Sequence, residues 1–200
     1  MKKRDRMERD RAAGKAELLC EALPWINKMS GKTFVIKYGG SAMEDPELCR
    51  QVVADIEMLK LMGVRIVLVH GGGKAINAML KRLDVPVKFK DGLRVTDDET
   101  MEAVQEVLVG HVNQQLVWAL NEYGHNAVGI SGADGKTLKA EPVDPDLGRV
   151  GRIREVDASL INTILDDGYI PVVATVGCGP DGFYNINADV AADKIAEAMG

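Results

Sequence analysis

Two glycine-rich turns in this chain directly follow two predicted strands. Residues 33–37 and 64–69 are apolar and rich in β-branched side chains, as buried strands are. Ligands of open α/β sheets bind at the carboxyl ends of the strands, and glycines let backbone N–H groups approach an anion closely. The two turns therefore predict a cradle for phosphate or carboxylate. Its residues are Gly39 and Gly40 after the first strand, and Gly71, Gly72 and Gly73 after the second.

Lys37 is the unusual residue of this pattern. It ends an apolar strand, a place from which lysine is normally excluded unless it extends to solvent. Beside a glycine loop its ammonium can neutralise the charge that builds on a phosphoryl group during transfer. The second turn is not a Walker A loop, because an alanine follows Gly73-Lys74 where that motif has Ser or Thr. The G-x-G-x-x-G match at 177–182 opens no helix, so we interpret it as a surface turn.

Two polar segments further along the chain could hold a carboxylate substrate. Arg94 precedes a predicted helix cap at Asp97, and a guanidinium fork suits a carboxylate bidentately. An arginine in a loop is, taken alone, more often a surface charge. Asn185 and Asp189 flank the start of the last predicted helix, where they make a good helix cap. They could equally bind a substrate and orient a catalytic lysine.

Length and composition narrow the class of protein. The chain has 200 residues, 46% of them hydrophobic and 28% charged, which indicates a folded globular domain. Its net charge of −5 gives no reason to expect a nucleic-acid partner, and no apolar run is long enough to cross a membrane. The three cysteines are scattered and the histidines lack ligand spacing, so we expect no disulfide and no protein-bound metal. We expect the protein to be cytoplasmic.

The order of the predicted elements favours an α/β fold. Strands and helices alternate after Gly31, which is typical of a mostly parallel central sheet covered on both faces. The predicted strands are 33–37, 64–69, 126–130, 152–156 and 170–176. The predicted helices are 46–62, 75–83, 97–123 with Gly110 as a point of interruption, one that begins after the cap Asp157, and 188–199.

Residues 1–30 form a separate segment. The first fifteen residues hold seven Lys or Arg against three acids, and an apolar stripe at helical spacing follows at 12–23. Pro24 is expected to end this helix. Two interpretations stay open: a helix lying on its own domain, or an arm that packs on a neighbouring subunit.

Taken together, these segments resemble the N-acetylglutamate kinases of the amino-acid kinase family. The resemblance is carried by Lys37-Tyr38-Gly39-Gly40, by the second glycine turn at 70–73, and by the segments 91–96 and 184–189. It implies a three-layer α/β sandwich, the amino-acid kinase fold, with 31–200 as the N-terminal, substrate-binding lobe. It further implies an enzyme that uses ATP with Mg²⁺ to phosphorylate the side-chain carboxylate of N-acetyl-L-glutamate, the second step of arginine biosynthesis.

The resemblance also implies a role for each candidate residue. Lys37 would stabilise the transferring phosphoryl group, and Asp189 would hold lysines in position. Arg94 would clamp the α-carboxylate of the substrate, and Asn185 would bind it from the opposite side. The glycines divide into Gly39, Gly40 and Gly71 for phosphate, and Gly72 and Gly73 for the reacting carboxylate.

The resemblance leaves three matters open. The segment 1–30 resembles the extension that interlaces dimers of arginine-inhibited members into a hexamer, which makes an arginine effector and a PII-type regulator possible partners. The family has proline at the position of Lys74, and its nucleotide-binding lobe has no counterpart before Gly200. A truncated, non-catalytic module that binds acetylglutamate or aids assembly is therefore an alternative, as is a kinase for a related acetylated amino acid such as aminoadipate.

Overall fold

A parallel sheet forms the centre of the computed structural model, which describes residues 2–39, 43, 45–122, 124 and 126–200. Its four strands run in the order β1-β2-β8-β5, and every neighbouring pair is parallel. The predicted parallel sheet is confirmed. The strands are β1 (Thr33–Tyr38), β2 (Arg65–His70), β5 (Ala127–Ser131) and β8 (Ile170–Ala174).

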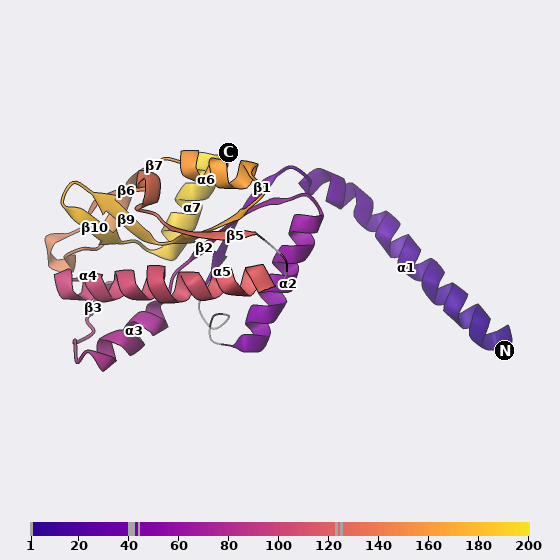
Figure 1. Cartoon of the computed structure of the whole chain (residues 1–200), viewed down its shortest axis with the longest axis horizontal. Helices are drawn as coiled ribbons and strands as arrows, with labels where there is room; N and C mark the ends of the chain where they lie inside the picture. Colours follow the sequence, from indigo (N-terminus) through magenta and orange to yellow (C-terminus); the bar gives the residue numbers. More distant parts are fainter. Residues whose placement is uncertain (1, 40–42, 44, 123, 125) are drawn as a thin grey trace.

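Helices cover both faces of this sheet. Successive side chains of a strand point to opposite faces, so Ile66 and Leu68 of β2 belong to one core and Val67 and Val69 to the other. All four are essentially inaccessible to solvent, which explains why β2 is continuously apolar. Figure 1 shows the long helix containing α4 and α5 on one side of the strands and α6 and α7 on the other. The first core receives α2 (Pro46–Leu61), α3 (Gly73–Arg82), α4 (Asp98–Gln105) and α5 (Asn113–Glu122); the second receives α6 (Ser159–Asp166) and α7 (Ala188–Met199).

A second sheet lies beside the first, and here the sequence prediction was partly wrong. Residues 152–156 do not join the parallel sheet, and the predicted strand 170–176 divides after Ala174. The cause is a strand that sequence reasoning missed, β6 (Leu138–Pro142), which pairs with β7 (Gly151–Val156) antiparallel. The surface turn predicted at 177–182 is confirmed only for Pro180 and Asp181, which join β9 (Val176–Gly179) to β10 (Gly182–Asn185) in an antiparallel hairpin; residues 177–179 belong to β9. The order of this sheet is β10-β9-β6-β7.

The predicted long helix after Asp97 is continuous but changes its winding. The Asp97 carboxylate accepts a hydrogen bond from the Thr100 amide at 2.8 Å, which confirms the cap. Residues Glu106–Val112 then form a π-helix, and the amide of Asn113 donates to the carbonyl of Leu108, five residues earlier. The interruption expected at Gly110 is therefore a widened turn that begins before this glycine.

The N-terminal helix α1 (Lys2–Met29) is longer than predicted, because Pro24 lies inside it. A proline removes one N–H donor and leaves the carbonyl four residues earlier without its helical partner. In this exposed helix water can take that place. Figure 1 shows α1 extending away from the body of the molecule, and large apolar side chains on it are open to solvent, including Leu18 at 70% and Trp25 at 64%. Across the described residues, none of the helices combines the length and apolar character that a bilayer span demands.

Candidate functional site

The predicted site residues lie around one cavity of about 260 Å³ at the carboxyl edge of the parallel sheet. The register between β1 and β2 places Tyr38 opposite His70, so the two glycine turns leave the sheet side by side. Gly40 lies outside the described residues. The other eight predicted residues all line the cavity: Lys37, Gly39, Gly71, Gly72, Gly73, Arg94, Asn185 and Asp189.

Of the glycines that line the cavity, Gly72 has the least room for a side chain. A Cβ atom on Gly72 would lie 2.7 Å from Cδ2 of Leu108, whereas one on Gly39 would meet only the flexible end of Lys37, at 3.3 Å, and one on Gly73 would meet nothing within 4 Å. Gly73 opens α3, and the first amides of a helix have no acceptor within it. Backbone N–H groups and the positive end of the helix can therefore interact with an anion that binds in this cavity.

Lys37 reaches the cavity as an ion pair with Asp189. Its Nζ atom lies 3.0 Å from Oδ1 of Asp189, in the first turn of α7. Asn187 caps this helix by accepting hydrogen bonds from the amides of Asp189 and Val190, which fixes the start of the helix. The side chains are 36% and 73% exposed, and such pairs contribute only about 0–1 kcal/mol to stability. In this pair the Lys37 ammonium lies beside the first glycine turn, 3.3 Å from the position of a Cβ atom on Gly39.

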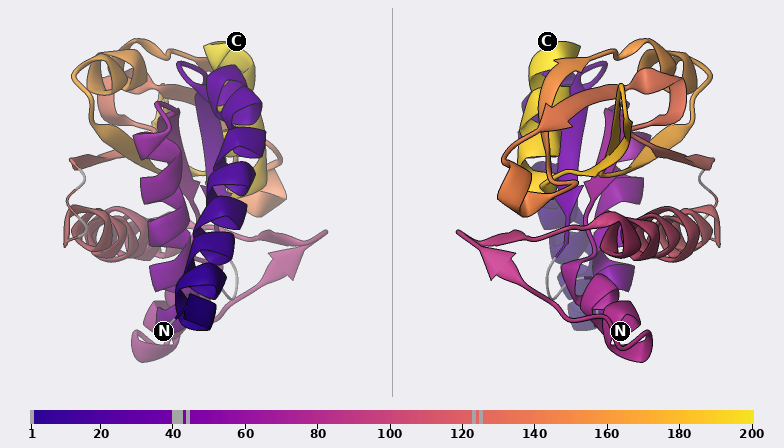
Figure 2. Two further views of the ribbon diagram at one scale, coloured as in Figure 1. Left: turned by 90° about the vertical axis from the view of Figure 1, so that its right-hand side faces the viewer. Right: turned by 90° about the vertical axis from the view of Figure 1, so that its left-hand side faces the viewer.

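A short hairpin carries Arg94 to the wall of the cavity. Strands β3 (Phe89–Lys90) and β4 (Leu93–Arg94) are joined by Asp91 and Gly92, both with positive φ, as a two-residue hairpin turn requires. Figure 2 shows this hairpin standing out from the body. The Arg94 guanidinium lies 5.0 Å from the centre of the Phe89 ring, a favourable cation–π distance. Phe89, which also lines the cavity, was not predicted, because nothing in its local sequence distinguishes it from a surface residue.

One nitrogen of the Arg94 guanidinium is buried and has no hydrogen-bond partner. Only 8% of the residue is exposed, and Nη2 donates to the carbonyl of Gly73 at 3.0 Å. Nη1 is buried with no hydrogen-bond partner. Burial lowers the pKa of Arg94, but a guanidinium remains protonated at neutral pH. A buried, charged donor at a cavity wall is suited to bind an anionic oxygen.

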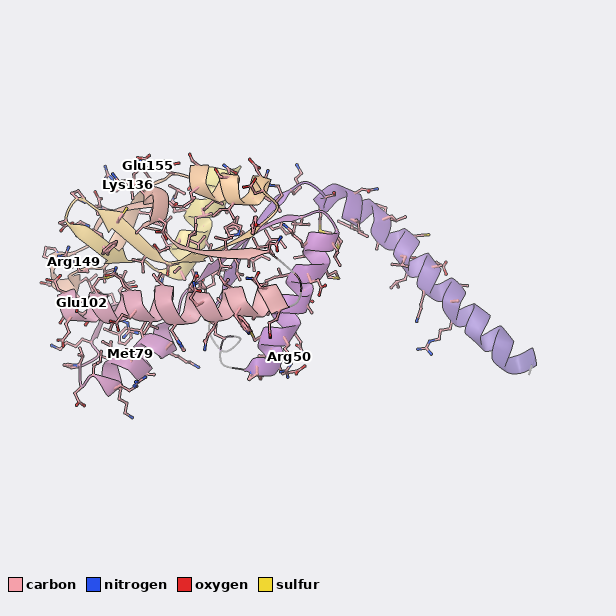
Figure 3. The ribbon with its side chains drawn as sticks, viewed as in Figure 1. Arg50, Met79, Glu102, Lys136, Arg149 and Glu155 are labelled. Atoms are coloured by element: carbon pink, nitrogen blue, oxygen red, sulfur yellow. The ribbon has the colours of Figure 1, made fainter. Side chains whose placement is uncertain are left out.

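Asn185 is tied to the Arg94 segment through Thr96, a residue that sequence reasoning did not select. Asn185 Nδ2 donates to Oγ1 of Thr96 at 3.2 Å, and that hydroxyl donates to the carbonyl of Arg94 at 2.8 Å. Arg149 bridges the same two segments with its backbone, since its amide donates to Thr96 and its carbonyl accepts from Asn185. The Arg149 side chain forms an ion pair with Asp98. Figure 3 labels Arg149, near Glu102, at this end of the molecule.

The cavity is thus lined by two kinds of group that can bind an anion. One is the glycine turns with the Lys37 ammonium, and the other is the Arg94 guanidinium with the Asn185 amide; Arg94 also contacts the second glycine turn through the Gly73 carbonyl. Such a site can bind an anionic molecule and neutralise charge that develops on it. Among the described residues, no group of three His, Cys, Asp or Glu side chains could hold a metal ion.

Comparisons with known proteins identify the family of this chain. Residues 32–200 match the amino acid kinase family. The chain belongs to that family. It is 55% identical over 188 residues to the acetylglutamate kinase of Caldanaerobacter subterraneus subsp. tengcongensis, covering 92% of this chain and 63% of that relative. The chain thus spans less than two thirds of the length of that curated relative.

Two solved structures resemble this amino acid kinase chain closely. The smu.665 protein of Streptococcus mutans has a TM-score of 0.78 at 32% identity, covering 84% of this chain and 68% of that one. The N-acetylglutamate synthase of Neisseria gonorrhoeae, solved with coenzyme A and N-acetyl-glutamate, has a TM-score of 0.77 at 27% identity, covering 90% and 42%. The expected amino-acid kinase fold is confirmed.

Proposed function

We propose that the protein phosphorylates the side-chain carboxylate of N-acetyl-L-glutamate with ATP, the second step of arginine biosynthesis. The observation that carries the proposal is the buried, unpartnered Nη1 of Arg94 in the same cavity as Lys37 and the glycine turns. This arrangement matches a substrate with two carboxylates, one to be held and one to react. The 55% identical relative named acetylglutamate kinase supports the choice of substrate.

In the proposed reaction, a side-chain carboxylate oxygen attacks the γ-phosphorus of ATP. A bond forms between that oxygen and phosphorus, the bond to the β–γ bridging oxygen breaks, and ADP leaves. No protein base is required, because the carboxylate is already ionised at neutral pH. Mg²⁺ enters with ATP as part of the substrate.

Catalysis then consists of alignment and charge neutralisation. Gly72 and Gly73 would donate their amides to the reacting carboxylate, while Gly39, Gly40 and Gly71 would serve the phosphate. Lys37 would neutralise charge on the transferring group, and Asp189 would hold the ammonium in place. Arg94 and Asn185 would bind the α-carboxylate end of the substrate.

Calorimetry with N-acetyl-L-glutamate, paired with a coupled assay of ADP release, tests this function. We expect saturable binding, ADP release that depends on the acetylated substrate, and much weaker binding of L-glutamate. N-acetyl-L-aminoadipate serves as the discriminating competitor. If it binds more tightly than N-acetyl-L-glutamate, the substrate assignment is wrong.

We also propose that α1 is an oligomerisation arm of a cytoplasmic enzyme. Its exposed apolar side chains, among them Leu18, Leu19, Leu23 and Trp25, are 52–70% accessible, and Figure 3 shows no other element beside the outer part of the helix. In this proposal the arm joins dimers into a hexamer and contributes to a site for arginine; a PII-type regulator would act on the same assembly. Deletion of residues 1–25 should lower the particle mass measured by light scattering. An unchanged oligomer would contradict the role of the arm.

A further inference from the structure

His70 is fully buried where β2 becomes the second glycine turn. Its backbone is paired on both sides, with Tyr38 of β1 and with Ala174 of β8, so the ring projects from a fixed position in the sheet. Each ring nitrogen has a neighbour at 3.0 Å. Nδ1 lies at that distance from the carbonyl oxygen of Gly71, and Nε2 from Nδ2 of Asn113.

Asn113 determines which ring nitrogen carries the proton. Its Nδ2 also donates to the carbonyl of Val172 at 2.8 Å and approaches that of Ile130 at 3.4 Å, so the amide faces these acceptors with its NH₂ group. An NH₂ group only donates, and Nε2 of His70 must therefore accept. The ring hydrogen is then on Nδ1, which donates to the carbonyl of Gly71. Burial lowers the pKa of His70, which agrees with a neutral ring.

This bond fixes the direction of the next amide. The C=O and N–H of a trans peptide point in opposite directions. Because the Gly71 carbonyl is directed to the His70 ring, the N–H of Gly72 must point away from that ring, and Gly72 itself lines the cavity. From the other side, Leu108 and Val112 of the π-helix pack on Gly72 so closely that a Cβ atom would lie 2.7 and 3.3 Å from them.

We propose that His70 and Asn113 are positioning residues, which hold the peptide between Gly71 and Gly72 so that the Gly72 amide faces the bound anion. The π-helix has a part in this, since Asn113 is the first residue of α5 directly after it. The identity of the anion, the reacting carboxylate of N-acetyl-L-glutamate, rests on the proposed function. The proposal that His70 and Asn113 hold this peptide in place does not depend on the proposed function.

Two matched variants separate the two nitrogens of the ring. In His70→Asn, the side-chain amide nitrogen occupies roughly the position of Nδ1 and can still donate to Gly71. In His70→Gln, the terminal group reaches roughly the position of Nε2 and can still pair with Asn113, but the bond to Gly71 is lost. A residue that only fills the core would respond to both changes alike.

The measurements are ¹⁵N relaxation of the Gly72 amide without ligand and calorimetry with N-acetyl-L-glutamate. We expect His70→Gln to lower the order parameter of Gly72 and weaken binding about tenfold, and His70→Asn to stay within about threefold of wild type. Leu120→Ala, a buried change further along α5, is the control that should lower the melting temperature with neither effect.

The outcomes discriminate clearly. An equal response of both His70 variants, or a Gly72 amide in His70→Gln as rigid as in wild type, overturns the proposal. If the relaxation contrast is present but wild type binds no N-acetyl-L-glutamate, the clamp is supported and the proposed function has failed.

Discussion

Because one nitrogen of Arg94 is buried without a partner, we expect its removal to weaken substrate binding much more than it lowers stability. In Arg94→Met the apolar stem of the side chain is largely kept and the guanidinium is lost. Removing one partner of a buried, hydrogen-bonded charge pair costs about 2–5 kcal/mol of binding, which is about 30- to 4,000-fold in the dissociation constant. We expect the affinity for N-acetyl-L-glutamate to fall within that range.

The stability of the unliganded protein should change much less. The substitution removes the charged hydrogen bond from Nη2 to Gly73, about 1.5–3 kcal/mol, and the contact with Phe89, about 0.5–1 kcal/mol. It also removes the buried Nη1, whose desolvation without a partner costs about 1–3 kcal/mol. These terms largely offset one another, which leaves a net loss of about 1 kcal/mol in the free energy of unfolding.

Calorimetry and denaturant unfolding of the same protein samples measure both effects. Arg152→Met is the matched control, because its guanidinium is exposed, pairs with Glu141 and lies outside the cavity. The control should bind N-acetyl-L-glutamate as wild type does. An Arg94→Met protein that binds within twofold of wild type would refute the assignment of Arg94 to a substrate carboxylate.

Three further predictions follow from the geometry. Lys37→Met should lower kcat at least about 100-fold while its affinity for the substrate stays within a few-fold of wild type. Asp189→Asn should lower kcat by a smaller factor. Turnover of the Lys37 variant at the wild-type rate would exclude a catalytic role for Lys37. Gly72→Ala should destabilise by about 1–3 kcal/mol in denaturant unfolding, because its Cβ would lie 2.7 Å from a leucine methyl carbon, whereas Gly73→Ala, with nothing within 4 Å of its Cβ, should cost clearly less. Hydrogen bonds from Thr100 hold the pKa of Asp97 below its ordinary 3.8. The ionised Asp97 carboxylate therefore stabilises the folded protein above about pH 4, and this stabilisation is lost as the pH falls through the lowered pKa of Asp97. Asp97→Asn should therefore unfold with a weaker pH dependence between about pH 5 and 2, and an unchanged dependence would contradict this.

The elements that carry the cradle were predictable because their signals are local. The apolar runs that became β1 and β2 indicate strands, and the glycines that follow them mark the turns. The cap at Asp97 and the last helix, Ala188–Met199, were likewise set by residues a few positions apart. Parallel strands bring their carboxyl ends together, so two local patterns were sufficient to predict one shared site.

What could not be predicted depends on pairing between distant segments. The strand β6 is five residues long, has no β-branched or aromatic residue and ends in a proline, and a bulge between Lys139 and Ala140 interrupts its register with β7. The helix α1 passes through Pro24 because no packing forces it to end there. Sequence order also gives no sign that Asn113 contacts His70, or that Thr96 contacts Asn185 across 89 positions.

The arrangement of the site was therefore predicted in kind but not in detail. Arg94 could be selected as a carboxylate ligand through the resemblance of its segment to known kinases. That one of its nitrogens is buried without a partner depends on Gly73 and Phe89, which the fold brings to it.

The most direct test of the central claim is a crystal structure of the protein with N-acetyl-L-glutamate bound. The account predicts the side-chain carboxylate within about 2.7–3.2 Å of the amides of Gly72 and Gly73, and the α-carboxylate at the same distance from Nη1 of Arg94. A ligand bound in the reverse direction, with its α-carboxylate at the glycines, or one bound outside this cavity, would contradict it.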